Sequence, residues 1–254
     1  MIWKAFGCFM IAGALLPPLV SAEPLQATDF EAVCLAVDDL QRTFGDAYQI
    51  GADDLAELRN ARAQAEAVLN AANAGDAQAK RTMERWNDLA RAALLANPLL
   101  AFDALIVIKR GENQLGLSQN WEGNSSLPIS GYDNEMAVLS PLDSGTLTTL
   151  YRPTKDVFVG DVDLHFDGDR LLFSMPGANA RWQVHEMNLR DSVVRELSLI
   201  IEPDVDNYDA CYLPDGNILF TSTAPFVGVP CVTGASHVAN IYHYDTSSGR
   251  IRRL

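Results

Sequence analysis

The chain has 254 residues, enough for one large domain or two small ones, and its hydrophobic (48%) and charged (20%) contents are ordinary for a globular protein. Its formal net charge is −14. Proteins that bind nucleic acid or an anionic membrane surface use clustered Lys and Arg, so this acidic balance excludes both as expected partners.

The first 22 residues have the pattern of a signal peptide. Lys4 is followed by the apolar run Ala5–Leu19, and the small residues before Glu23 suit signal peptidase. The apolar run is too short to favour a membrane span. We therefore expect cleavage after Ala22 and a periplasmic or secreted protein, with no membrane span elsewhere in the chain.

Residues 23–98 are expected to form a helical leader. Thr28 and Glu31 have the spacing of a capping box, in which two side chains hydrogen-bond free backbone N–H groups at the start of a helix. Apolar residues then recur at helical spacing in three successive segments. Asn97-Pro98 ends the last segment, because the residue before a proline is disfavoured in the α region.

After Pro98 the pattern changes to short apolar strands separated by turn residues, which is typical of all-β structure. Two segments can be superposed: DVDLHFDGDRLLFSM (161–175) and DACYLPDGNILFTST (209–223). Each contains a strand, an Asp-Gly turn and an apolar strand ending in Phe and a hydroxyl residue, and two more strands follow each. The turns begin at Asp167 and Asp215, 215 − 167 = 48 residues apart. Asp-Gly is favoured there because a tight hairpin turn needs positive φ.

A four-stranded unit of this length is the signature of a β-propeller blade. With Phe102–Tyr151 as a looser first copy, we expect about three four-stranded blades, at 99–155, 156–200 and 201–254. The predicted fold class is α + β, an N-terminal helical segment followed by an incomplete β-propeller. Closed propellers typically have four to eight blades. The chain is therefore expected either to be a fragment or early-terminated form of a longer protein, or to have its ring completed by partners.

Four segments of the sequence resemble one family. They are NPLLAFDALIVIKR, NWEGNSSLPISGYDNEMAVLS, FVGDVDLHFDGDRLLFSMPG and EPDVDNYDACYLPDGNILFTSTAPFVGVPCV. The family comprises exported bacterial propeller proteins related to the N-terminal part of the hydrazine synthase alpha subunit, with blades similar to TolB-type repeats. The resemblance extends from about residue 30 to residue 254, so it includes the helical leader.

This resemblance implies a scaffold more than a catalyst. In hydrazine synthase the chemistry is carried by c-type haems in domains after the propeller, whereas this sequence contains no CxxCH motif. No catalytic or cofactor-binding residue is therefore carried over. The resemblance implies a non-catalytic, exported scaffold or binding module, the front part of a larger hydrazine-synthase-alpha-like protein.

Acidic side chains gather on the predicted inner strands, which line the central channel of a propeller. Because side chains alternate along a strand, Asp161, Asp163 and His165 share one face. Asp209 lies on the corresponding strand of the next blade. Oxygen ligands suit calcium, and a histidine admits a transition metal. The four residues are a candidate divalent-cation site, or they hydrogen-bond loops and neighbouring blades. No other cofactor is expected in this chain.

Three cysteines remain after the predicted cleavage: Cys34, Cys211 and Cys231. In an oxidising compartment a Cys211–Cys231 disulfide is one interpretation, and buried free thiols are the other.

Three functions are therefore open. The first is a scaffold that binds a protein or small molecule at the propeller face, with further blades supplied by a missing C-terminal part or by a partner. The second is a periplasmic oxidoreductase or hydrolase that uses the acidic, metal-binding channel around Asp163 and His165. The third is a degenerate fragment without an independent function.

Overall fold

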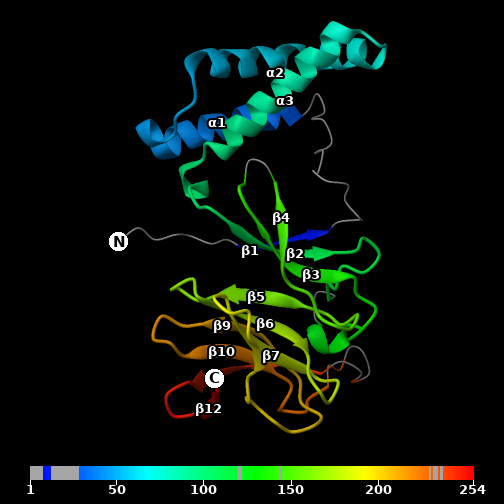
Figure 1. Cartoon of the computed structure of the whole chain (residues 1–254), viewed down its shortest axis with the longest axis vertical. Helices are drawn as coiled ribbons and strands as arrows, with labels where there is room; N and C mark the ends of the chain where they lie inside the picture. Colours follow the sequence, from blue (N-terminus) through cyan, green and yellow to red (C-terminus); the bar gives the residue numbers. More distant parts are fainter. Residues whose placement is uncertain are drawn as a thin grey trace. The chain divides into compact units, whose positions relative to one another are not determined.

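The computed structural model of the chain describes residues 8–12, 29–118, 122–142, 145–228, 230, 234 and 237–254. Three α-helices precede three four-stranded sheets (Figure 1), which is the predicted helical segment followed by an incomplete β-propeller. The described residues divide into two compact units, a helical one (29–103, with Leu142) and a β one with the remaining residues. None of the described helices has the length and hydropathy of a membrane span.

The helical unit is built from the three predicted amphipathic segments. They form α1 (Asp29–Phe44), α2 (Ala52–Asn73) and α3 (Ala77–Leu95), with short 3-10 turns at Gly45–Ala47 and Pro98–Leu100. Their apolar stripes face one another, and the core contains the buried side chains Phe30, Val33, Val37, Leu58, Ala61, Ala65, Met83, Trp86 and Ala90. Helical periodicity therefore identified the buried faces correctly.

The helix cap that the structure shows at α3 was not predicted from the sequence. Asp76 caps α3, since its carboxylate accepts the backbone N–H groups of Gln78 at 2.7 Å and Ala79 at 3.0 Å. Thr28, the predicted cap of the first helix, lies outside the described residues.

The first sheet contains the looser copy of the repeat. β2 (Leu105–Arg110), β3 (Asn134–Leu139) and β4 (Leu147–Tyr151) form an antiparallel meander, and β1 (Cys8–Ala12) pairs in parallel with β2. A 3-10 turn at Asn124–Ser126 lies in the connection between β2 and β3. Because β1 falls inside the predicted signal peptide, the predicted cleavage would leave β2 as an edge strand.

The second and third sheets are the two clear repeats, and both are antiparallel throughout. The second contains β5 (Gly160–Leu164), β6 (Arg170–Pro176), β7 (Trp182–Asn188) and β8 (Val194–Glu196). The third contains β9 (Asn207–Tyr212), β10 (Ile218–Ser222), β11 (Asn240–Asp245) and β12 (Arg250–Arg253). Each predicted hairpin is therefore present.

The two repeats differ by one residue at the Asp-Gly turn. Asp163 pairs with Leu172 in the second sheet, and Cys211 pairs with Leu219 in the third. The spacing between equivalent residues is 211 − 163 = 48 before the turn and 219 − 172 = 47 after it. The longer turn of the second sheet is the one that contains His165, Asp167 and Asp169.

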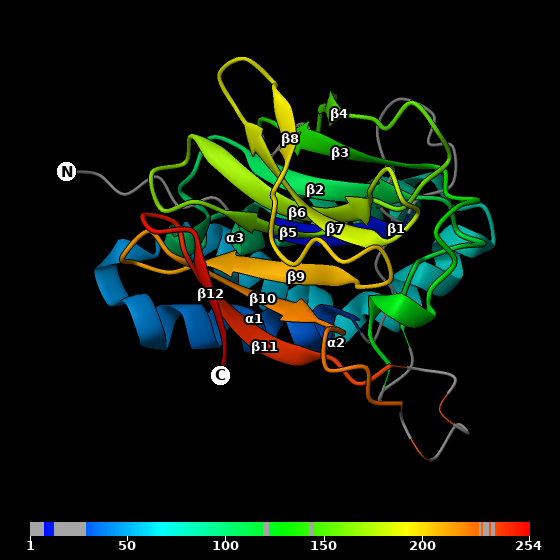
Figure 2. The same cartoon turned by 90° about the horizontal axis from the view of Figure 1, so that it is seen from below.

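The second sheet lies between the other two (Figure 2), and apolar side chains fill both junctions. β6 contributes to both because neighbouring residues on a strand point to opposite faces. Leu171 and Phe173 pack with residues of the first sheet, among them Ile108 and Met136. Leu172 packs with residues of the third sheet, including Phe220 and Tyr242.

Candidate functional site

Two aspartates on the edge strands β5 and β9 share an unusual backbone conformation. Asp161 has φ 50° and Asp209 has φ 51°, a left-handed conformation that residues other than glycine, asparagine and aspartate seldom adopt. In both sheets the strand register shifts at this point, which is the mark of a β-bulge. The bulge is thus part of the repeat, and it turns the backbone of β9 toward the second sheet.

The hydroxyl of Ser174 connects these two aspartates. Ser174, on β6, is fully buried, and its Oγ accepts the backbone N–H of Asp209 at 2.9 Å. The same side chain hydrogen-bonds the carboxylate of Asp161, which also accepts from the amide of Asn124. Burial raises the pKa of Asp161, and the charge of Asp209 adds to that effect against the hydrogen bond of Ser174.

Asp163 also contacts the neighbouring blade. Its Oδ2 accepts the backbone N–H of Tyr212, on β9, at 2.8 Å. Burial raises the pKa of this carboxyl group, and the hydrogen bond from Tyr212 opposes the increase. A predicted metal ligand is therefore engaged in a hydrogen bond between blades, which was the other interpretation of these side chains.

His165, Asp167 and Asp169 form a different cluster, at the hairpin between β5 and β6. Their potential ligand atoms lie within 4.8 Å of one another, so they could hold a metal ion. His165 Nδ1 lies 3.5 Å from Asp167 Oδ2 and 3.8 Å from Asp169 Oδ1. Among the described residues this is the group of His, Cys, Asp or Glu side chains whose ligand atoms lie this close together, and it shares only His165 with the predicted set.

The guanidinium group of Arg170 lies next to this cluster. Arg170 Nη2 lies 2.5 Å from His165 Nε2, and Arg170 Nη1 donates to Asp169 Oδ1 at 2.8 Å. A bound metal ion would compete with this guanidinium for Asp169. The sequence contained a signal for the cluster, a His followed by Asp at the second and fourth positions, but the Asp-Gly pair was interpreted only as a turn.

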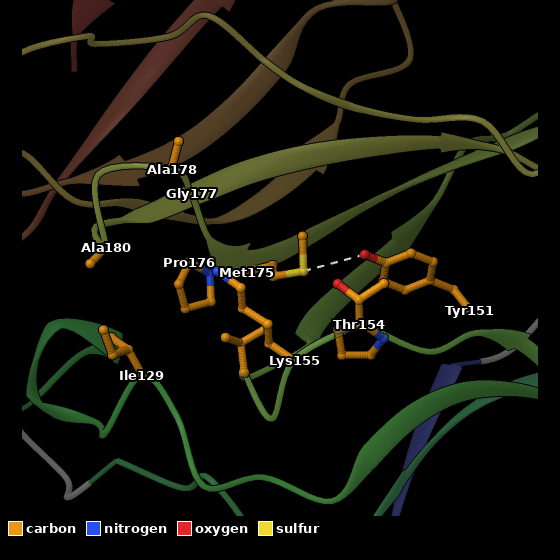
Figure 3. A pocket seen from close by; sticks show the side chains of 11 residues that line it. Ile129, Tyr151, Thr154, Lys155, Met175, Pro176, Gly177, Ala178 and Ala180 are labelled. Carbon is orange, nitrogen blue, oxygen red and sulfur yellow. Dashed lines mark hydrogen bonds between the residues drawn. The ribbon is translucent and has the colours of Figure 1, made fainter.

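A pocket of about 330 Å³ lies between the first and second sheets (Figure 3). Its walls come from the end of β4 with the connection to β5, and from the end of β6 with the β6–β7 loop. The hydroxyl of Tyr151 donates to the sulfur of Met175 at 3.5 Å, and Lys155 extends across the pocket toward Pro176. Ile129 lies on the side of the pocket away from Tyr151. Sequence reasoning did not identify this pocket, because its walls are separate loops without a motif.

The predicted disulfide is not tested by the structure. Cys231 lies outside the described residues. Cys211, on β9, is half-buried, and burial raises the pKa of its thiol. The Cys211–Cys231 pairing stays a prediction.

Comparisons with known proteins found structural likeness only. No family model matches the chain, and no curated protein matches it. The chain is similar to TolB from Acinetobacter baumannii, with 24% identity and a TM-score of 0.36 over 48% of this chain and 26% of that one. It is similar to a putative TolB from Agrobacterium tumefaciens, with 14% identity and a TM-score of 0.36 over 48% of this chain and 37% of that one.

A third similar structure is an oligogalacturonate lyase in complex with manganese, with 14% identity and a TM-score of 0.40 over 61% of this chain and 39% of that one. The chain thus spans well under half the length of each of these structures. Their TM-scores are low, so the fold of this chain is assigned from its own sheets.

Proposed function

We propose that this chain is a non-catalytic binding scaffold of an exported β-propeller protein, as its resemblance to the N-terminal part of the hydrazine synthase alpha subunit implies. The observation that carries the proposal is the hydrogen bond from the backbone N–H of Tyr212 to the carboxylate of Asp163. It supports a structural role for the acidic inner strands, in which a carboxylate of one blade holds the backbone of the next.

The other acids of these strands support the same role. Asp161 is engaged with Ser174 and Asn124, and the bulge at Asp209 directs its own N–H to Ser174. These contacts join the second sheet to the third and to the connection between β2 and β3. Side chains that position blades in this way leave binding to the faces and loops of the sheets, such as the pocket of Figure 3.

Substitution of Asp163 tests the structural role. Asp163→Ala leaves the buried N–H of Tyr212 without a partner, which costs about 1–3 kcal/mol of unfolding free energy. Asp163→Asn keeps an acceptor oxygen but has no charge. Burial disfavours the charged form of Asp163 and raises its pKa, so the Asn variant should be at least as stable as the wild type at pH 7. Urea denaturation of the three proteins measures both effects. An Asn variant as unstable as the Ala variant would contradict the proposal.

A metal-dependent enzyme is a second candidate, and the cluster of His165, Asp167 and Asp169 favours it. Carboxylate and imidazole ligands suit Mn²⁺ or Zn²⁺. If this candidate is right, calorimetric titration with either ion should give binding heat that Asp167→Asn abolishes. Asp215→Asn is the matched control, because Asp215 occupies the equivalent turn of the third sheet, where Leu213 stands in place of the histidine. Absence of heat with the wild type would eliminate the candidate.

A further inference from the structure

The pocket between the first two sheets has the size and lining of a small-molecule site. Its volume of about 330 Å³ lies at the lower end of the range of ligand pockets. Aliphatic side chains and prolines form most of the wall, and Met175 and the ring of Tyr151 lie opposite each other within it. A ligand that fits is about the size of an acetylated amino acid and carries an apolar group. An aromatic ring suits the thioether, which packs well against ring edges.

The charge of the pocket comes from Lys155. Its side chain is exposed, extends across the pocket, and has no ion-pair partner among the residues that the structure describes. The neighbouring Arg152 is engaged elsewhere, since it pairs with Asp133 and Glu135. The ammonium group of Lys155 is therefore available to an anion that enters the pocket.

A hydroxyl donor lies in another part of the pocket, at Met175. The O–H of Tyr151 donates to the thioether sulfur of Met175, which is a weak acceptor. A ligand oxygen is a stronger acceptor than a thioether, so the hydroxyl gains a hydrogen bond by turning to a polar group of a bound ligand. Burial raises the pKa of Tyr151, so the phenol keeps its proton at neutral pH.

We propose that this pocket binds a small apolar monocarboxylate, such as an N-acylated aromatic amino acid, with the carboxylate at Lys155 and the apolar group against Met175 and the ring of Tyr151. The inference rests on the proposed binding function and names its ligand class. The wall is assembled from two sheets, so the ligand also joins the first and second blades.

The test uses N-acetyl-L-phenylalanine as the probe and N-acetyl-L-phenylalaninamide as its neutral counterpart. Calorimetric titration of the full chain should show about tenfold tighter binding of the acid than of the amide, since a hydrogen bond to a charged group is the stronger kind. Lys155→Met should weaken binding of the acid about tenfold and leave the amide unchanged. Lys155→Arg keeps the charge and should retain most of the affinity.

Two further variants complete the experiment. Lys80→Met makes the same change of charge on an exposed residue of α3 and should not alter the affinity. Ala178→Trp places a large side chain on the pocket wall and should abolish binding of both compounds. Equal affinity for acid and amide, an effect of Lys155→Met no larger than that of Lys80→Met, or no binding to the wild type would overturn the ligand class. The Asp163 variants test the scaffold separately, so the two failures are distinguishable.

Discussion

At the scale of one residue, His185 shows how burial in the second sheet changes the pKa of a side chain. The ring is 5% exposed and stacks on Phe173 with centroids 5.4 Å apart. Its Nδ1 lies 3.2 Å from the carbonyl oxygen of Gln183. Burial lowers the pKa of His185 to about 4, and the contact with Gln183 opposes this effect. The folded protein therefore holds a neutral imidazole that the unfolded chain protonates near pH 6.5.

This shift predicts a pH dependence of stability. The folded-state pKa lies below the unfolded value, so the unfolded chain binds more protons between pH 4 and 6.5, and stability falls as the pH falls through that window. His185→Phe removes the titrating group while keeping an aromatic ring. The stability of the wild type relative to this variant should decrease by about 3 kcal/mol between pH 7 and pH 4.

The difference between variant and wild type is the quantity to measure, by urea denaturation at several pH values. The raised pKa values of Asp161, Asp163 and Asp206 act with the opposite sign in an overlapping window, and they cancel in this difference. His243→Phe, on the half-buried side of β11, is the control. Parallel pH profiles of wild type and His185→Phe would contradict the prediction.

At the scale of elements, Arg110 at the end of β2 holds the connection that follows this strand. This guanidinium is 1% exposed and lies 4.1 Å from the centroid of Phe158. It donates to the carbonyl oxygens of Leu115 and Val159, each at 2.7 Å. Burial lowers its pKa to about 10, against the attraction of Asp161. One side chain thus links the connection to the start of the second sheet.

Gly116 makes this arrangement possible, and its substitution tests it. A Cβ at Gly116 would lie 2.0 Å from Arg110 Nη1, and the residue has φ +65°. Gly116→Ala should therefore reduce the unfolding free energy by roughly 3 kcal/mol, from backbone strain and overpacking together. Gly145→Ala is the matched control, because Gly145 has φ +70° with nothing within 4 Å of its Cβ position.

The control isolates the backbone contribution, which should be about 1 kcal/mol. The midpoint of urea denaturation measures both variants. Equal losses would show that the contact with Arg110 contributes nothing beyond the conformation of the backbone.

The elements themselves were largely predictable. Helical spacing from Phe30 to Trp86 identified the buried stripes, and the Asp-Gly pairs placed both hairpin turns. There are two exceptions. The shift of one residue between Leu172 and Leu219 arises in the turn, where no apolar pattern marks the register. β1 pairs with a strand that is distant in the sequence, and pattern alone does not identify its partner.

At the scale of the whole molecule, the β unit depends on the middle sheet, which packs on both neighbours. Hydrogen bonds link the second sheet to its neighbours as well. Trp182 donates its backbone N–H to Asp206 Oδ1 at 3.1 Å, from the second sheet to the segment before the third. Contacts of this kind join residues that lie about half a repeat to a whole repeat apart, so each blade is specified partly by the next.

The sequence by itself determined the local order of this protein: three amphipathic helices, then strands and Asp-Gly turns in repeated units, with acids on the inner strands. Those features follow from the periodicity of side chains and from the conformations that Gly and Asp allow. Only the tertiary structure decided which partner each acid has. Asp163 meets a backbone N–H on the next blade, and His165 meets Asp167 and Asp169. The pocket at Lys155 is likewise a product of packing, because its walls become neighbours only when two sheets stack.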